Sequence, residues 1–160
     1  MKVSIIVPVY NEEERIVPCL KALMAVDLGL KEILVVDDGS TDRTGRMLKI
    51  LHDESFDRIK LVKHPYNMGK GMAIRSGIQA ATGEVICIFD ADQEYSPSDL
   101  AAVIAPVRCS NCSACYGSRF LKRGNKFLFL SYFANRILSL YSSWILGQRL
   151  TDMETALKAV

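Results

Sequence analysis

Short apolar runs alternate with amphipathic stretches along most of this chain, and this alternation is the strongest constraint on its fold. Val- and Ile-rich runs such as Ile33-Leu34-Val35-Val36 are typical of strands buried on both faces. The elements expected from the pattern, strand and helix in turn, are Val3–Val9, Glu13–Ala25, Glu32–Asp37, Thr41–Asp53, Ile59–Lys63, Gly69–Ala81, Glu84–Phe89, Pro97–Val107 and Ala114–Gly117. Repeated strand–helix units predict an α/β fold with a mostly parallel sheet and helices on both faces. Ser40 or Thr41 is expected to cap the second helix.

Length and charge limit the possible functions. The 160 residues suit one domain, expected to span residues 1–160. Because the net charge is only +2 and Lys and Arg are spread along the chain, there is no basic stripe of the kind that binds nucleic acid. The first apolar run is too short for a signal peptide, so we expect a cytoplasmic location.

The five cysteines fit a reducing compartment. Cys19 and Cys87 lie in apolar surroundings typical of buried free thiols. Cys109, Cys112 and Cys115 form C-x2-C-x2-C, a spacing also found in zinc and iron–sulfur sites. No fourth ligand lies close by in the sequence, so we interpret these three as incidental thiols.

A dense acidic cluster follows the apolar run that ends at Phe89. Asp90, Asp92 and Glu94 occupy three of five consecutive positions, directly after a predicted strand. Carboxylates this close repel one another unless a cation joins them, and hard oxygen ligands suit Mg²⁺ or Mn²⁺. The cluster therefore predicts a divalent metal ion and, with it, a bound phosphate.

Two further polar loops are expected beside this cluster. Pro8-Val9-Tyr10-Asn11-Glu12 ends the first strand, and Asp37-Asp38-Gly39-Ser40-Thr41-Asp42 ends the second. The carboxyl ends of parallel strands meet at one edge of the sheet, where open α/β sheets bind ligands. Asp38 can accept N–H bonds from a nucleobase, and Tyr10 can offer a ring face.

Five ordered motifs together resemble a known family. They are Pro-Val-Tyr-Asn-Glu, Val-Val-Asp-Asp-Gly-Ser-Thr-Asp, Asn-x-Gly-Lys-Gly-x-Ala-Ile-Arg-x-Gly, Asp-Ala-Asp and Tyr-Gly-Ser-Arg-Phe. In this order the chain resembles a family 2 glycosyltransferase of the GT-A fold, near the polyprenyl-phosphate sugar transferases related to dolichyl-phosphate mannose and glucose synthases. Members of that family normally continue for several more elements, so the chain resembles a catalytic domain truncated at its C-terminus.

The resemblance assigns roles to particular residues. It implies a nucleotide-sugar pocket lined by Pro8, Tyr10, Glu12, Val36, Asp38, Asp90 and Ala91. It also implies a Mg²⁺ or Mn²⁺ site at Asp90, Asp92 and Glu94, and a catalytic set of Asp92, Arg119 near phosphate and Asp152 near the acceptor. The implied reaction is an inverting transfer of a sugar from a GDP- or UDP-sugar donor to polyprenyl or dolichyl phosphate.

The apolar stretch from Phe127 to Leu146 is expected to form an amphipathic helix. Asn135 and Arg136 at its centre argue against a lone membrane span. The helix either packs on the domain or lies in a membrane interface, behind basic residues at Lys122, Arg123 and Lys126. Peripheral contact with the cytoplasmic membrane face is thus one expectation for this segment.

Two other functions remain open at this point. One is a nucleotide-sugar-binding fragment without turnover, which donor binding without transfer would identify. The other is a glycosyltransferase with a soluble or polysaccharide acceptor, or a GT-A-like nucleotidyltransferase. The processive synthases carry Gln-x-x-Arg-Trp, which is absent here, and nucleotidyltransferases usually have a Gly-rich basic loop where this chain has Tyr10-Asn11-Glu12.

Overall fold

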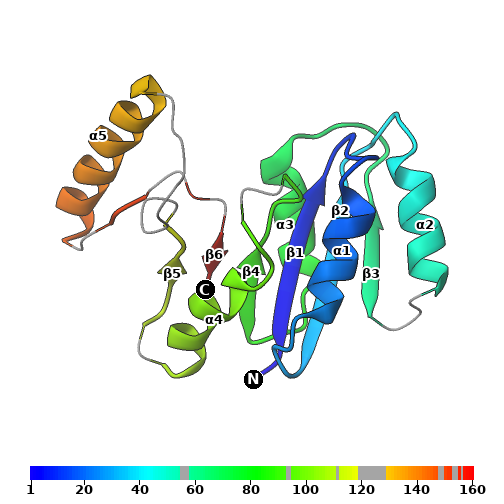
Figure 1. Ribbon diagram of the computed structural model, residues 1–160, viewed down its shortest axis with the longest axis horizontal. Coiled ribbons are helices and arrows are strands. Elements are labelled where there is room, and N and C mark those ends of the chain that lie inside the picture. Colours follow the sequence, from blue (N-terminus) through cyan, green and yellow to red (C-terminus); the bar gives the residue numbers. More distant parts are fainter. Residues whose placement is uncertain are drawn as a thin grey trace.

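The computed structural model describes residues 1–54, 58–92, 95–110, 112–118, 129–147, 150–152, 155 and 157–160 (Figure 1). Strands and helices alternate through most of the chain, as the apolar pattern predicts. The elements are β1 (Val3–Val9), α1 (Ile16–Ala25), β2 (Lys31–Asp37), α2 (Thr44–Glu54), β3 (Ile59–Lys63), α3 (Lys70–Ala80), β4 (Val85–Ile88), α4 (Asp99–Arg108), β5 (Cys115–Tyr116), α5 (Phe129–Leu146) and β6 (Lys158–Ala159).

The strands form one sheet in the order β3-β2-β1-β4-β6-β5. Strands β1 to β4 pair in parallel, with β1 at the centre of this group. The two-residue strand β6 is antiparallel to both β4 and β5, and the sequence pattern did not predict it. The mostly parallel α/β sheet expected from the alternation is confirmed.

Helices cover both faces of the sheet because its central strands are apolar on both sides. Ile5 and Val7 of β1 belong to a core shared with α1, α2 and α4, whereas Ile6 packs with Ala73 of α3 on the opposite face. Helix α3 lies very close to β1, since a Cβ built at Gly77 would come within 2.5 Å of the Ile6 side chain. In Figure 1, α1 and α4 lie in front of the sheet and α3 lies behind it.

Helix α5 lies to one side of the sheet (Figure 1). Its buried side chains include Asn135 and Ser139, which are polar, while Trp144 is 80% exposed and Leu140 and Tyr141 are each 60% exposed. In the described ranges, no helix is long and apolar enough to cross a membrane. Much of the apolar surface of α5 therefore faces outward.

Candidate functional site

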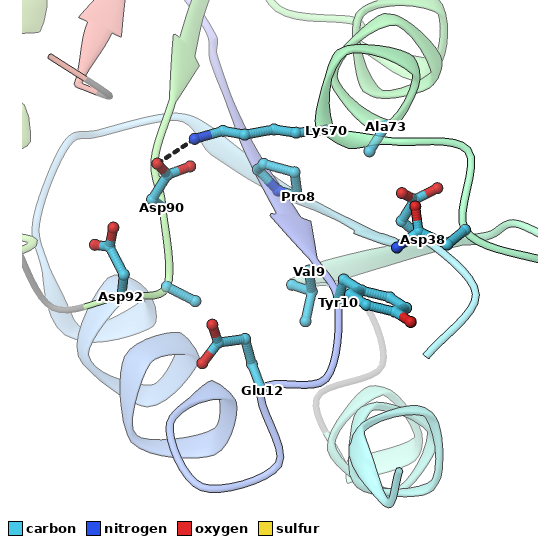
Figure 2. Close-up of a pocket in the computed structure, with 11 residues that line it drawn as sticks. Pro8, Val9, Tyr10, Glu12, Asp38, Lys70, Ala73, Asp90 and Asp92 are labelled. Carbon is cyan, nitrogen blue, oxygen red and sulfur yellow. Dashed lines mark hydrogen bonds and ion pairs between the residues drawn. The ribbon is translucent and has the colours of Figure 1, made fainter. Parts of the chain in front are cut away.

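A cleft of about 310 Å³ opens at the carboxyl edge of the parallel strands. Residues following β1, β2 and β4 and residues of α3 form its walls, as Figure 2 shows. Its lining consists of Pro8, Val9, Tyr10, Glu12, Asp38, Asn67, Lys70, Ala73, Asp90, Ala91 and Asp92. The three polar loops that were expected to meet at one edge of the sheet do meet there.

Hydrogen bonds connect the loop after β1 to the loop after β2 and to the start of α2. Asn11 adopts a left-handed backbone conformation, φ 54°, which asparagine tolerates better than most residues. Its N–H donates to Ser40 Oγ at 3.0 Å, and its side-chain oxygen accepts from the Thr41 N–H at 2.9 Å. The N–H of Glu12 donates to Thr44 Oγ1 at 2.9 Å. These bonds fix Tyr10 and Glu12 relative to the second loop.

Gly39 lets the second loop pass close to the segment after β3. Its φ is +71°, and a Cβ at this position would lie 2.3 Å from the carbonyl carbon of Tyr66. Only glycine satisfies both conditions without displacing backbone. The close approach brings Asn67 and the residues after it to the wall formed by Asp38.

Asp38 is a heavily hydrogen-bonded carboxylate of the cleft. Its Oδ1 accepts from Met68 N at 3.0 Å and lies 2.6 Å from His64 Nδ1, while its Oδ2 accepts from Gly69 N at 2.8 Å. Burial raises the pKa of Asp38, but the hydrogen bonds from His64, Met68 and Gly69 outweigh burial and hold that pKa below its ordinary value. Asp38 is therefore ionised at neutral pH and fixed in orientation.

The opposite side of the cleft is acidic. Asp90, Asp92 and Glu12 all line it, and Lys70 Nζ forms an ion pair with Asp90 Oδ2 (Figure 2). The nearby Cys19 thiol has a pKa raised to about 11. Burial is the largest cause, and the negative charges of Asp92 and Glu12 add to it. Negative charge thus accumulates here on three carboxylates, with Lys70 paired to one of them.

The donor set fits Mg²⁺ or Mn²⁺ in an open site. Within the part of the chain that the structure describes, no three His, Cys, Asp or Glu side chains form a closed metal-binding group. Mg²⁺ is commonly bound by one or two carboxylates together with substrate phosphates rather than by a complete protein cage. Asp90 and Asp92 supply hard oxygen donors of this kind beside a cleft that has room for a phosphate.

Some residues expected in the site lie elsewhere. Val36 is fully buried in the core beside α3 and is absent from the cleft lining. Asp152 is 1% exposed and accepts a 2.7 Å hydrogen bond from Asn135 Nδ2 of α5. It does not line this cleft, and its assignment to the acceptor stays a prediction. Glu94 and Arg119 fall outside the described residues.

The structure also adds residues to which no role was assigned from the sequence. Asn67 and Ala73 join the lining from the segment that carries the Asn-x-Gly-Lys-Gly motif. His64, to which no motif assigns a role, is 7% exposed and contacts Asp38 directly. A lone histidine in a sequence carries no sign of its spatial partners, so only the fold reveals this contact.

The cysteines are all free. Cys109 is exposed, and Cys112 and Cys115 are partly buried, so the three do not share one environment. Burial raises the pKa of Cys87 to about 12, with a smaller effect of Cys115, which fits an unreactive thiol in the core.

Comparison with known proteins relates this chain to enzymes that transfer sugars. The chain is 32% identical over 125 residues to a dolichol-phosphate mannosyltransferase of Pyrococcus furiosus, covering 78% of this chain and 35% of that protein. The structure resembles the mannosyltransferase PcManGT from Pyrobaculum calidifontis in complex with GDP-Man and Mn²⁺, with a TM-score of 0.57 and 33% identity, covering 62% of this chain and 30% of that one. It also resembles S. aureus TarS 1-349 in complex with UDP-GlcNAc, with a TM-score of 0.62 and 25% identity, covering 82% and 38%.

These neighbours confirm the expected GT-A fold. The chain spans between 30% and 38% of the length of each of the three proteins. Residues 4–151 match the family described as Glycosyl transferase family 2. Since that match covers nearly all of the chain, the protein belongs to the family 2 glycosyltransferases.

Proposed function

We propose that the cleft binds a nucleotide-sugar, a GDP- or UDP-sugar, and that the protein transfers the sugar with inversion to a polyprenyl phosphate in a metal-dependent reaction. One observation carries this proposal. A fixed, ionised carboxylate, Asp38, and a pair of further carboxylates, Asp90 and Asp92, line the same cleft. A nucleobase with an N–H donor fits the first, and a cation-bridged diphosphate fits the second.

Different residues of the cleft would contact different parts of the donor. Asp38 would accept a hydrogen bond from the base, and Tyr10, which is 44% exposed, would offer its ring to the base or ribose. Asp90 and Asp92 would hold the metal ion, which when bound neutralises the leaving diphosphate. Lys70 pairs with Asp90 and would add positive charge near the same phosphates.

The transfer itself needs little proton chemistry from the protein. The bond from the anomeric carbon to the donor phosphate oxygen breaks as a bond to an acceptor phosphate oxygen forms on the opposite face. A phosphate acceptor is already an anion at neutral pH, so positioning and charge neutralisation supply most of the rate enhancement. Asp152 and Arg119 would orient the acceptor and a phosphate, an assignment that rests on their motifs.

The compared proteins support this proposal in different respects. The PcManGT structure is a complex with GDP-Man and Mn²⁺, and the TarS structure is a complex with UDP-GlcNAc. The Pyrococcus protein is named for dolichol phosphate. The donor class is therefore a nucleoside diphosphate sugar in each structural neighbour, whereas the base differs between them.

Calorimetric titration of the 160-residue chain with GDP and UDP, each with and without Mn²⁺, tests the proposal. We expect Mn²⁺-dependent binding of at least one of the two nucleotides. Binding with incorporation of sugar from the matching donor into polyprenyl phosphate would support the complete reaction. Binding without transfer to any acceptor would support a nucleotide-sugar-binding protein instead, and absence of nucleotide binding would contradict the proposal.

The exposed apolar surface of α5 supports peripheral contact with a lipid surface, where a polyprenyl phosphate resides. Trp144, Leu140 and Tyr141 are each at least 60% exposed. Basic residues at Lys122, Arg123 and Lys126 precede the helix in sequence. Exposed apolar side chains with basic residues nearby in the sequence are the composition that interfacial helices use on anionic lipids.

Cosedimentation with anionic phospholipid vesicles tests this contact. We expect Trp144→Glu to weaken vesicle binding by at least about tenfold, since one apolar side chain of this size contributes on the order of 1.5–3 kcal/mol. Leu30→Glu is the matched control because Leu30 is 74% exposed and lies in the turn before β2. Equal vesicle binding by the wild type and both variants would argue against α5 as the contact.

A further inference from the structure

His64 connects the cleft to the interior through a chain of three side chains. It follows β3 directly, and its backbone N–H donates to the carbonyl of Asp37 at 2.8 Å. Its Nδ1 lies 2.6 Å from Asp38 Oδ1, and its Nε2 lies 2.9 Å from Ser76 Oγ of α3. Both ring nitrogens of a buried imidazole are thus satisfied by one carboxylate and one hydroxyl.

The two partners determine which nitrogen of His64 carries the proton. An ionised carboxylate only accepts hydrogen bonds, so His64 Nδ1 must be the donor to Asp38. In the neutral ring Nε2 is then an acceptor, and the Ser76 hydroxyl can donate to it. Ser76 therefore stabilises the tautomer that Asp38 requires.

These contacts leave one hydrogen-bond acceptor position of Asp38 available to a ligand. A carboxylate has about four acceptor positions. Among the described contacts, Oδ1 takes two, from His64 and Met68, and Oδ2 takes one, from Gly69. The remaining position belongs to Oδ2 of a residue that lines the cleft.

We propose that His64, held in one tautomer by Ser76, is a positioning residue for nucleotide recognition: it turns Asp38 so that Oδ2 accepts a hydrogen bond from a ring N–H of the base. This inference rests on the proposed function, because it assumes that the cleft binds a nucleotide. Uracil and guanine carry a ring N–H between two carbons on their pairing edge, whereas adenine has an acceptor there. The arrangement therefore selects UDP or GDP against ADP.

Two substitutions separate positioning from a merely structural role. His64→Asn keeps an N–H donor near the place of Nδ1, and His64→Leu removes it. The probes are UDP, GDP and ADP with Mn²⁺, and Mn²⁺ with pyrophosphate, which has no base. We expect His64→Leu to weaken binding of the preferred nucleotide by about tenfold and to reduce the protein's preference for that nucleotide over ADP. Binding of pyrophosphate should be unchanged. His64→Asn should restore most of the affinity and the preference.

Each other result has a definite meaning. Equal weakening of nucleotide and pyrophosphate by His64→Leu would overturn the inference in favour of general destabilisation, and an unchanged preference over ADP would overturn it as well. If the wild type binds Mn²⁺ and pyrophosphate but no nucleotide, the proposed function itself fails, and this inference with it.

A measurement on the ligand-free chain stands apart from nucleotide binding. The ¹⁵N shifts of the His64 ring at neutral pH should report the Nδ1–H tautomer, and Ser76→Ala should increase the other tautomer. A wild-type ring protonated on Nε2 alone would overturn the inference even if nucleotides bind.

Discussion

The two aspartates of the acidic motif differ in their surroundings. Asp90 forms an ion pair with Lys70, whereas Asp92 adds to the negative charge felt by Cys19. If Asp92 binds the metal ion, the negative charge of its side chain contributes more to that binding than the side chain's shape does. The nearly isosteric Asp92→Asn keeps the volume and removes the charge.

We expect Asp92→Asn to lower the affinity for nucleoside diphosphate in the presence of Mn²⁺ by at least about tenfold, because a neutral amide is a weak ligand for a hard cation. Affinity without Mn²⁺ and the melting temperature should change little. Titration calorimetry and circular dichroism measure these quantities. Wild-type Mn²⁺-dependent affinity in the variant would remove Asp92 from the metal site.

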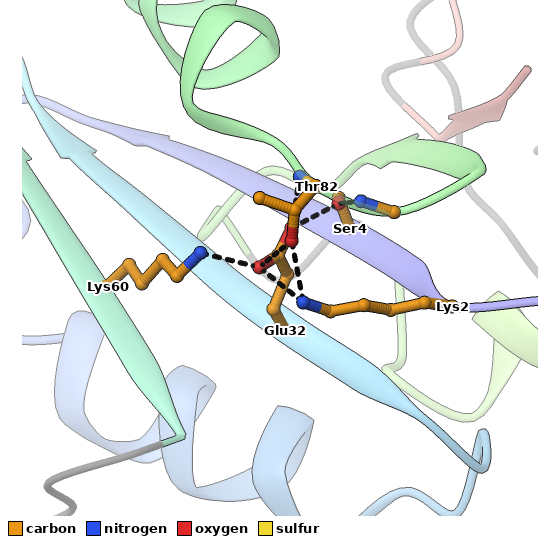
Figure 3. Close-up of polar contacts among 6 residues, drawn as sticks. Lys2, Ser4, Glu32, Lys60 and Thr82 are labelled. Atoms are coloured by element: carbon orange, nitrogen blue, oxygen red, sulfur yellow. Dashed lines mark hydrogen bonds and ion pairs between the residues drawn. The ribbon is translucent and has the colours of Figure 1, made fainter.

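Another carboxylate, Glu32, stabilises the opposite edge of the sheet. Its Oε2 accepts from Lys2 Nζ at 2.9 Å, Lys60 Nζ at 2.8 Å and Thr82 Oγ1 at 2.9 Å, and its Oε1 accepts from Ser4 Oγ at 2.5 Å (Figure 3). Burial raises the pKa of Glu32, but hydrogen bonds led by that from Lys60 outweigh burial and hold the pKa well below its ordinary value of 4.5. The carboxylate therefore joins β1, β2, β3 and the segment before β4.

Glu32→Gln should lower the free energy of unfolding at pH 7 by about 2–4 kcal/mol, since it removes charge-assisted bonds from a buried group. The folded pKa lies below the unfolded one, so this contribution is complete above about pH 4.5 and is lost as pH falls further. Urea denaturation between pH 7 and pH 3 should show the difference from wild type shrinking only below that value.

The control for Glu32 is Glu84→Gln at the same edge of the sheet. The Glu84 carboxylate is 63% exposed and pairs with the N-terminal amine at 3.5 Å. We expect a change within about 0.5 kcal/mol, as for most surface ion pairs. If both variants unfold alike at every pH, Glu32 does not have the role assigned to it.

The residues of the site could be predicted where they lie in a motif at a strand end. Tyr10, Asp38 and Asp90 were found in this way because the carboxyl ends of parallel strands converge. His64 could not be found, since its importance comes from contacts with Asp38 and Ser76 that no local pattern encodes. Val36 was assigned to the pocket from its motif, but its neighbours in β2 place its side chain in the core.

At the scale of elements, the turn after β2 depends on one glycine. Gly39→Ala would place a methyl group within van der Waals overlap of the Tyr66 backbone and in a left-handed conformation. We expect a loss of at least about 2 kcal/mol of unfolding free energy and weaker nucleotide binding, because the turn positions Asp38. Chemical denaturation and calorimetry measure the two effects.

Gly71→Ala provides the matched control. Gly71 lies in the first turn of α3, and a Cβ there would meet no atom within 4 Å. Replacing an exposed helical glycine by alanine should raise stability by up to about 1 kcal/mol. Similar losses for both variants would mean that the close approach at Gly39 does not limit stability.

The boundaries of elements were harder to predict than their order. The predicted strands Val3–Val9 and Ile59–Lys63 match β1 and β3 at both ends. Capping of α2 by Ser40 or Thr41 was wrong: the helix begins at Thr44, and Asp42 Oδ1 accepts the N–H of Thr44 at 2.9 Å. Strand β6 was missed because two residues are too few to show a period, and its pairing with β4 and β5 is not local.

At the scale of the whole molecule, the sheet and α5 differ in the side chains that they bury. Ile5, Ile6 and Val7 of β1 are fully buried at the centre of the sheet, with helices on both faces. The described side chains of α5 that are buried include Asn135 and Ser139, and Asn135 bonds to Asp152. The sheet has a large apolar core, whereas the described hydrogen bonds from α5 to other segments go to Leu150 and Asp152, which precede β6.

This contrast predicts two levels of stability, which hydrogen exchange with mass spectrometry can measure. An isolated helix of this length is only marginally stable in water, so α5 should open without unfolding the sheet. Amides of β1 should exchange at the rate of global unfolding, and those of α5 at least about a hundredfold faster. If anionic vesicles cover the outward surface of α5, exchange there should slow on their addition while exchange in β1 stays constant. Equal protection of α5 and β1 in the absence of lipid would instead mean that they unfold as one cooperative unit.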